Sequence, residues 1–354
     1  MSELWSHLVH RLHPYVPGEQ PKILDLIKLN TNENPYPPSP KAVNILRDSD
    51  HNLLRLYPDP ASQGLKNTLA QHFSVKANQV FVGNGSDEVL ALAFMAFFKK
   101  DKPLLFPDIS YSFYPVYCGL YEIDFIKVPL ANDFSISISD YQIENGGVIF
   151  PNPNAPTGKL LPLDHVEAIL ESNIRSVVIV DEAYIDFGGE SAVSLVDRYK
   201  NLLVIQTLSK SRSLAGLRLG FAIGHEDLID GLERVKNSFN SYPVDRIAES
   251  VAIAAIEDTE YFNTCNKAII DTRNRVEQAL LALDFDVIES KANFLFAAPR
   301  RVTAKALFED LREQNILVRY FDKPRISDYL RISIGTNEEM DGFLQVVESI
   351  IKQA

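Results

Sequence analysis

One lysine of the sequence lies in surroundings that favour covalent chemistry. Lys210 follows the apolar run Leu202–Ile205, which is typical of a buried strand. A lysine amine can form a Schiff base with an aldehyde cofactor, while hydroxyls and a guanidinium hold the phosphate of that cofactor. The hydroxyls of Thr207 and Ser209 and the guanidinium of Arg218 are the candidates for this role. On these residues alone, an ordinary exposed basic loop is an equally good interpretation.

The composition and charge of the chain argue against several kinds of binding partner. The chain has 354 residues and a net charge of −12, which disfavours a role in gripping nucleic acid or an anionic membrane. Its two cysteines, Cys118 and Cys265, are too few for a disulfide framework or a structural zinc site, and they fit a reducing cytoplasm. The longest apolar run, Val89–Phe98, is too short to cross a bilayer, and no signal-peptide pattern opens the chain. We therefore expect a cytoplasmic protein with small-molecule partners.

The first 40 residues predict an extended N-terminal arm. The prolines of Tyr15–Gly18 and Leu29–Pro38 forbid helix and favour an extended or turning path. A segment so rich in Asn, Tyr and Pro packs poorly alone, so we expect it to lie on its own domain or on a partner subunit. His7, His10 and His13 share a helical spacing, but without a carboxylate or cysteine beside them they favour a solvated face over a metal site.

The rest of the chain predicts two domains. Residues 41–240 alternate short apolar runs with helical patterns, which indicates an α/β fold with a mainly parallel sheet covered by helices. The runs are Val80–Val82, Leu104–Phe106, Ile123–Val128, Val148–Phe150, Val177–Val180, Leu202–Ile205 and Leu219–Ile223. Residues 241–354 begin with two long helical patterns and continue with short strands and helices, which predicts a smaller α+β domain.

Ligands of such sheets bind beyond the carboxyl ends of the strands, so the residues that follow each strand are candidates. Ser86 and Asp87 open a helix after the first run, and its free N–H groups would favour a phosphate; a glycine turn with a helix cap is the alternative. Tyr111 and Tyr114 follow the second run, and either could stack on a flat ring or simply pack.

Two further strand ends carry polar side chains. Asn154 lies in a polar turn, where it could donate to a ring oxygen or serve turn chemistry alone. Asp181 ends a buried run, where a carboxylate is costly unless it has a partner. A protonated pyridine nitrogen is one such partner; a helix cap or a metal carboxylate are the competing interpretations.

Taken in this order, the strand ends resemble those of the fold-type I pyridoxal-phosphate aminotransferases over nearly the whole chain, and among them the histidinol-phosphate aminotransferases most. The motifs that carry the resemblance are Tyr15-Val-Pro-Gly18, Asn32-Glu-Asn-Pro35, Tyr57-Pro-Asp-Pro60, Gly85-Ser-Asp-Glu88, Asp181-Glu-Ala-Tyr184, Ser209-Lys210 with Arg218, and Leu330-Arg-Ile332. The resemblance implies a large domain and a small domain, an N-terminal arm, pyridoxal 5'-phosphate as cofactor, and a homodimer with a shared site.

The resemblance also implies roles for individual residues. Lys210 would form the Schiff base and move the proton, Asp181 would pair with the pyridine nitrogen, and Tyr184 would reach the ring hydroxyl oxygen. Tyr111 would stack on the ring, and the phosphate would lie among Ser86, Asp87, Thr207, Ser209, Arg218 and, from the neighbouring subunit, Tyr57.

For substrates, the resemblance implies histidinol phosphate and glutamate or 2-oxoglutarate, in histidine biosynthesis. Arg331 would grip the substrate anion, with Arg319 and Tyr15 at the phosphate end. One position departs from the family: Ala155 stands where an asparagine commonly touches the cofactor. Either Asn154 substitutes through a shifted turn, which we predict, or this contact is absent.

Other functions share these residues. An aromatic amino acid aminotransferase or a pyridoxal-phosphate-dependent decarboxylase of a phosphorylated amino acid would carry the same lysine, aspartate and arginine. A non-catalytic binding protein that retains the fold is a third possibility, and the intact Lys210, Asp181 and Arg218 argue against it.

Overall fold

The computed structural model describes residues 3–21 and 25–353, so residues 1–2 and 22–24 of the predicted arm and residue 354 of the predicted small domain lie outside it. Within these ranges, none of the helices combines the length and the apolar character that are needed to cross a bilayer.

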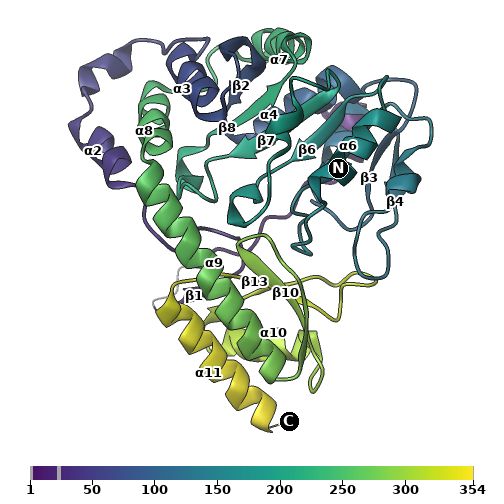
Figure 1. Ribbon diagram of the computed structural model, residues 1–354, viewed down its shortest axis with the longest axis vertical. Coiled ribbons are helices and arrows are strands. Elements are labelled where there is room, and N and C mark those ends of the chain that lie inside the picture. Colours follow the sequence, from purple (N-terminus) through teal and green to yellow (C-terminus); the bar gives the residue numbers. More distant parts are fainter. Residues whose placement is uncertain (1–2, 22–24, 354) are drawn as a thin grey trace.

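A seven-stranded sheet forms the upper part of the molecule in Figure 1. The strands lie in the order β2-β8-β7-β6-β5-β3-β4, and only β8 runs against the others. Their bounds are β2 Val80–Gly83, β3 Leu104–Pro107, β4 Phe125–Val128, β5 Gly147–Pro151, β6 Val178–Asp181, β7 Leu202–Thr207 and β8 Gly220–Gly224. The predicted α/β fold with a mainly parallel sheet is confirmed, and each strand matches one of the seven apolar runs.

Helices cover both faces of this sheet, which is why its central strands are buried along their whole length and mostly apolar. Alternate residues point to opposite faces, so Val178 and Val180 join one core while Ile179 joins the other. The first core is closed by α3 Gln63–Phe73, α6 Leu163–Ser172 and α8 Arg246–Glu257. The second is closed by α4 Gly85–Ala93, its continuation Phe94–Phe98, α5 Tyr114–Tyr121 and α7 Glu226–Phe239.

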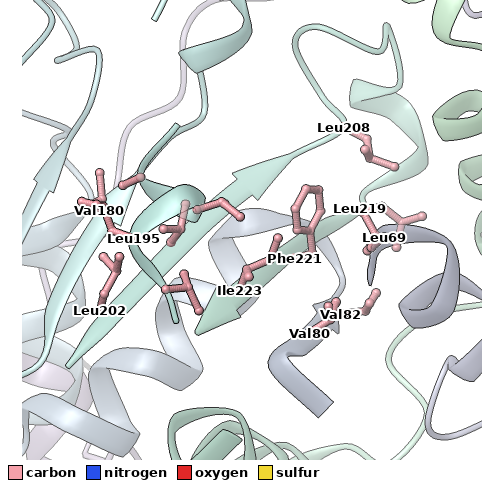
Figure 2. Close-up of a cluster of buried hydrophobic side chains, with 14 of the residues drawn as sticks. Leu69, Val80, Val82, Val180, Leu195, Leu202, Leu208, Leu219, Phe221 and Ile223 are labelled. Atoms are coloured by element: carbon pink, nitrogen blue, oxygen red, sulfur yellow. The ribbon is translucent and has the colours of Figure 1, made fainter. Parts of the chain in front are cut away.

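Figure 2 shows the part of the first core that lies beneath the reversed strand, where Phe221 and Ile223 of β8 pack beside Val80 and Val82 of β2. Leu69 of α3 closes this region.

The reversed strand brings two distant segments to the same edge. Gly220 pairs with Gly83 on one side and with Thr207 on the other, so β8 begins where β2 and β7 end. Residues 208–219 therefore leave and return at the carboxyl edge of the sheet, and this places both Lys210 and Arg218 there.

A four-stranded antiparallel sheet forms the core of the lower part, in the order β12-β13-β10-β9 (Figure 1). Its strands are β9 Phe285–Ile288, β10 Phe294–Pro299, β12 Arg319–Tyr320 and β13 Leu330–Ser333. Apolar residues of β10 and β13 pack against α9 Thr259–Ala282, α10 Ala304–Glu313 and α11 Asn337–Gln353. The predicted smaller α+β unit is thus present.

The arm is tied to both parts. It holds α1 His7–Arg11 and β1 Ile27–Lys28, and β1 pairs in parallel with β11 Ile316–Leu317. It ends at α2 Pro40–Asp48, which Ser39 caps by accepting from the backbone of Ala42. The domain boundaries at 40 and 240 stay predictions; α8, beyond the second, shares the core of the large sheet.

Candidate active site

Two glycines bring Arg218 against the start of helix α4. Gly85 has a φ of +83°, and a Cβ there would lie 2.6 Å from Nη2 of Arg218. A Cβ on Gly220 would lie 2.3 Å from the backbone nitrogen of Ser86. Only glycine allows these approaches. They combine a guanidinium with the free N–H groups of a helix N-terminus, an arrangement that favours a phosphate.

The predicted hydroxyls lie at the same place. Thr207 and Ser209 are buried, with their hydroxyl oxygens 2.9 Å apart, and the backbone of Ser209 donates to Thr207 Oγ1 (3.1 Å). Because Gly220 pairs with Thr207 and packs on Ser86, these groups and Arg218 surround one small region.

Asp87 connects this region to the predicted stacking ring. Its carboxylate accepts from Arg218 Nη2 (3.2 Å) and from the hydroxyl of Tyr111 (2.9 Å). The Tyr111 ring also lies edge-on to Tyr114, with centroids 5.6 Å apart. These contacts give Asp87 an orienting role, which the sequence did not reveal.

Asp181 is buried at the end of β6, and its carboxylate accepts from the hydroxyl of Tyr114 (2.8 Å). Burial raises the pKa of Asp181 to about 6, although the hydrogen bonds from Tyr114 and from the backbone of Ala183 act in the opposite direction. Of the two tyrosines that the sequence offered as stacking rings, Tyr114 is thus a buried partner of the carboxylate. A cation beside Asp181 would restore its charge.

Lys210 lies in the turn after β7, and its Nζ donates to the backbone oxygen of Thr31 (3.0 Å). Burial, and then the positive charge of Arg331, lower the pKa of Lys210 to about 8. Because of this lowered pKa, a substantial fraction of the lysine amine is unprotonated near pH 7. A nucleophile or a general base must be unprotonated to act.

The arm holds the predicted catalytic residues in place. Asn32 Nδ2 donates to the hydroxyl oxygen of Tyr184 (3.0 Å), and Asn34 Nδ2 donates to the backbone oxygen of Lys210 (3.0 Å). Sequence reasoning gave neither asparagine a role. The only signal was the arm motif itself, since their partners lie more than 150 positions away.

The predicted contact of Asn154 with a cofactor stays a prediction. Its Nδ2 donates to the backbone oxygen of Ile109 (3.1 Å) and to Thr157 Oγ1 (3.0 Å), so both hydrogens are used within the protein. Its buried Oδ1 has no hydrogen-bond partner in the described part of the chain. Ala155 packs in a small apolar cluster with Phe294 and Tyr184.

The three predicted substrate residues gather at one end of the site. Arg319 and Arg331 are opposite each other on β12 and β13, and each guanidinium carbon lies 5.7 Å from the ring centroid of Phe321. Arg331 donates to the backbone oxygen of Asn30 (2.8 Å), while its buried Nε has no partner among the described residues. Tyr15 stacks on Phe113, with centroids 4.8 Å apart, and lies within electrostatic reach of Arg331. Such a cluster can bind an anion.

Tyr57 lies apart from this group. Its side chain is 78% exposed and stacks on Tyr242, with centroids 4.7 Å apart, while its backbone oxygen accepts from Arg246 (3.0 Å). In the ranges that the structure describes, no contact joins Tyr57 to the other predicted site residues.

The arrangement fits a flat ring that carries a phosphate at one end and a protonated nitrogen at the other. Arg218 and the α4 N-terminus would supply an anion site, while Asp181 is a buried carboxylate that no cation of the described chain pairs. Lys210 lies nearby with a tuned amine, its Nζ 5.9 Å from the Tyr184 ring centroid. The roles of individual residues stay predictions.

Comparisons with known proteins place this fold and site in a class. The profile of the family Aminotransferase class I and II matches residues 24–347, and the chain therefore belongs to that family. Within it, the chain is 62% identical to Histidinol-phosphate aminotransferase 1 of Hydrogenovibrio crunogenus, over 99% of each protein. It is 59% identical to Histidinol-phosphate aminotransferase of Pseudomonas syringae, over 98% of this chain and 99% of that protein.

A solved structure shares the fold throughout. It is histidinol-phosphate aminotransferase from Sinorhizobium meliloti in complex with pyridoxal-5'-phosphate, with a TM-score of 0.89, 20% identity, and coverage of 100% of this chain and 99% of that chain. The family model and the two relatives confirm the family that the sequence motifs resembled.

The pKa of Asp181 predicts how the stability of the protein, freed of bound small molecules, depends on pH. Between about pH 4 and pH 6 the folded protein keeps a proton on Asp181 that the unfolded chain has lost, so stability falls as pH rises through this window. Asp181→Asn cannot ionise, so its stability does not fall as pH rises through this window. We expect the variant and the wild type to be equally stable below pH 4, and the variant to gain on the order of 2–3 kcal/mol above pH 7.

Urea unfolding at a series of pH values measures this difference. Replacement of the exposed Asp101 by asparagine is the matched control. A stability difference for Asp181→Asn that is the same at pH 4 and pH 8 would contradict the account.

Proposed function

We propose that the protein is a pyridoxal-phosphate-dependent aminotransferase of histidine biosynthesis. It moves an amino group between L-histidinol phosphate and 2-oxoglutarate, giving imidazole acetol phosphate and L-glutamate. The observation that carries the proposal is a half-buried lysine with a lowered pKa, near a buried aspartate without an ion-pair partner, the Arg218 guanidinium at the start of α4, and the pair Arg319 and Arg331. The similarity to relatives named histidinol-phosphate aminotransferase supports the choice of substrate.

The residues divide the work of holding the cofactor. Ser86, Thr207, Ser209 and Arg218 would hold the phosphate, with Asp87 orienting Arg218. Tyr111 would lie against the ring, and Tyr184 would donate to its hydroxyl oxygen. Asp181 would keep the pyridine nitrogen protonated, since a cation there relieves the cost of the buried carboxylate.

When bound, pyridoxal phosphate stores the amino group between the half-reactions and withdraws electrons from the substrate α-carbon. Lys210 would take the proton from that carbon and deliver it to the former aldehyde carbon (C4′) of the cofactor, acting first as base and then as acid, which its lowered pKa favours. Arg331, with Arg319 and Tyr15 beside it, binds the substrate anion and orients the α-carbon toward Lys210.

The half-reaction with L-histidinol phosphate tests the proposed substrate. Mixing it with the holoenzyme in the absence of any keto acid should convert the bound cofactor to pyridoxamine phosphate in one turnover, seen as loss of visible absorbance. Lys210→Ala should abolish the conversion, because Lys210 is the group that is proposed to move the proton.

The same assay with phenylalanine and tyrosine separates the alternatives. Faster conversion by the aromatic amino acids than by histidinol phosphate would favour an aromatic aminotransferase. Release of CO₂ from a phosphorylated amino acid would favour a decarboxylase, and either result would contradict the proposed substrate.

Arg331→Ala should weaken substrate binding by about 2–5 kcal/mol, the range for removing one partner of a desolvated charge pair. The value of kcat/KM should fall accordingly for both substrates. Arg331→Lys keeps the charge but loses the planar fork, so it should retain part of the activity. Steady-state kinetics with histidinol phosphate and with glutamate measures both variants. An unchanged kcat/KM for both substrates in Arg331→Ala would contradict this role.

We also propose a cytoplasmic homodimer in which Tyr57 reaches the phosphate of the neighbouring subunit. Its support is a group of exposed apolar side chains from residues 43–57, together with Tyr242, which stacks on Tyr57; this group is here called the Tyr57 surface. The surface consists of Val43, Leu46, Leu53, Leu54, Leu56, Tyr57 and Tyr242. The free thiols of Cys118 and Cys265 are buried and fit a reducing compartment.

Leu54→Glu should split the dimer and lower activity, because a charge in an apolar interface is strongly unfavourable. Sedimentation should show twice the chain mass of 39.8 kDa for the wild type and a single chain mass for the variant. Ile174→Glu, at a side chain that is 74% exposed and outside the Tyr57 surface, is the control and should stay dimeric. A monomeric, fully active wild type would contradict the proposal.

A further inference from the structure

Asn32 is held at four points where the arm passes between the two sheets. Its backbone nitrogen donates to Ser333 Oγ (2.8 Å), and its backbone oxygen accepts from Asn293 Nδ2 (3.0 Å). Its side-chain Oδ1 accepts from the same Ser333 hydroxyl (2.8 Å), and its Nδ2 donates to the hydroxyl oxygen of Tyr184 (3.0 Å). The residue is 1% exposed, with a φ of +55° that asparagine tolerates.

The hydrogen count of Ser333 fixes the direction of this network. Its hydroxyl accepts from the backbone of Asn32, so its single hydrogen is free to go to Asn32 Oδ1. That assigns the amide oxygen to Ser333 and the amide nitrogen to Tyr184. With the amide reversed, Ser333 would accept twice and its own hydrogen would lose its acceptor.

Tyr184 therefore accepts on the side of the arm and has its hydrogen left to donate on the other side. Burial raises the pKa of Tyr184, so the phenol keeps that hydrogen. The ring is packed edge-on against Phe294, with centroids 5.1 Å apart, and Ala155 belongs to the same cluster. The ring is thus fixed in position, with Nζ of Lys210 5.9 Å from its centroid.

We propose that Asn32 is a positioning residue for the proposed reaction, which makes Tyr184 a one-way donor to the hydroxyl oxygen of the pyridine ring. The inference rests on the proposed function. Donation from Asn32 polarises the Tyr184 O–H group and strengthens the hydrogen bond that this group makes. Since Ser333 of β13 orients Asn32, the smaller sheet sets the donor strength of a tyrosine that lies on the larger unit.

The visible absorbance of the holoenzyme changes with pH, and the midpoint of this change measures how strongly the Tyr184 hydroxyl donates. If Tyr184 donates a weaker hydrogen bond, the hydroxyl oxygen of the pyridine ring is less able to carry negative charge. The proton whose loss changes the absorbance is then retained to a higher pH. Asn32→Gly removes the amide and keeps the left-handed backbone without strain. We expect its midpoint to rise by about half a unit to one unit, the effect of one hydrogen bond.

Three further variants separate this role from a structural one. In a Tyr184→Phe background, Asn32→Gly should cause no additional shift, because its effect passes through the phenol. Ser333→Ala should raise the midpoint less than Asn32→Gly does, since the amide is then only loosely oriented. Asn30→Ala removes a side chain of the same arm that donates to the backbone of Glu19 and should leave the midpoint unchanged.

The outcomes decide between the claims. An Asn32→Gly midpoint equal to that of the wild type, or the same shift with and without Tyr184, would overturn the inference and leave the proposed function standing. If Asn32→Gly does not fold, Ser333→Ala decides, and an unmoved midpoint there overturns the inference. A wild-type holoenzyme without any pH-dependent visible band would overturn the proposed function and this inference with it.

Discussion

The site depends on one constraint, the convergence of strand ends at a single edge of the large sheet. Five parallel strands and β2 deliver their carboxyl ends to that edge, and the reversed β8 begins there. Gly220 is the point of contact, because it pairs with both neighbouring strands and leaves no room for a side chain beside Ser86. Without that close approach, Arg218 and the α4 N-terminus would not share one anion site.

Two ionisable side chains at this edge, Asp181 and Lys210, lack an ion-pair partner in the described part of the protein. Asp181 is buried and Lys210 is half-buried, and the partial loss of water shifts the pKa of each toward the neutral form. A bound group with a protonated nitrogen and an aldehyde would pair with Asp181 and react with Lys210. The same desolvation that costs free energy in the empty site would then favour binding and reaction of that group.

Much of the fold was readable from the sequence, because buried parallel strands are continuous apolar runs and all seven were found. The helix α7, Glu226–Phe239, shows in its sequence the apolar spacing and the acidic first turn that are typical of a helix. The edge strand β9 was missed, because its four residues are a short run of one buried, one exposed and two half-buried side chains with no distinct pattern.

The side-chain network was not readable. Tyr111 and Tyr114 look alike in sequence, and only the packing shows that Tyr114 is the one bonded to Asp181. Asn32 and Ser333 lie 301 positions apart, and no periodicity connects an arm to a strand of another sheet. Ala155, by contrast, was visible as a departure from the family motif, and the structure shows an apolar contact where that motif has an amide.

The central claim is that Lys210 forms a covalent bond with a bound pyridine aldehyde. Borohydride reduction of the holoenzyme, followed by proteolysis and mass spectrometry, tests it most directly. The account predicts loss of the visible absorbance and a stable pyridoxyl phosphate adduct on the peptide that contains Lys210. An unmodified Lys210, or an adduct on another lysine, would contradict it.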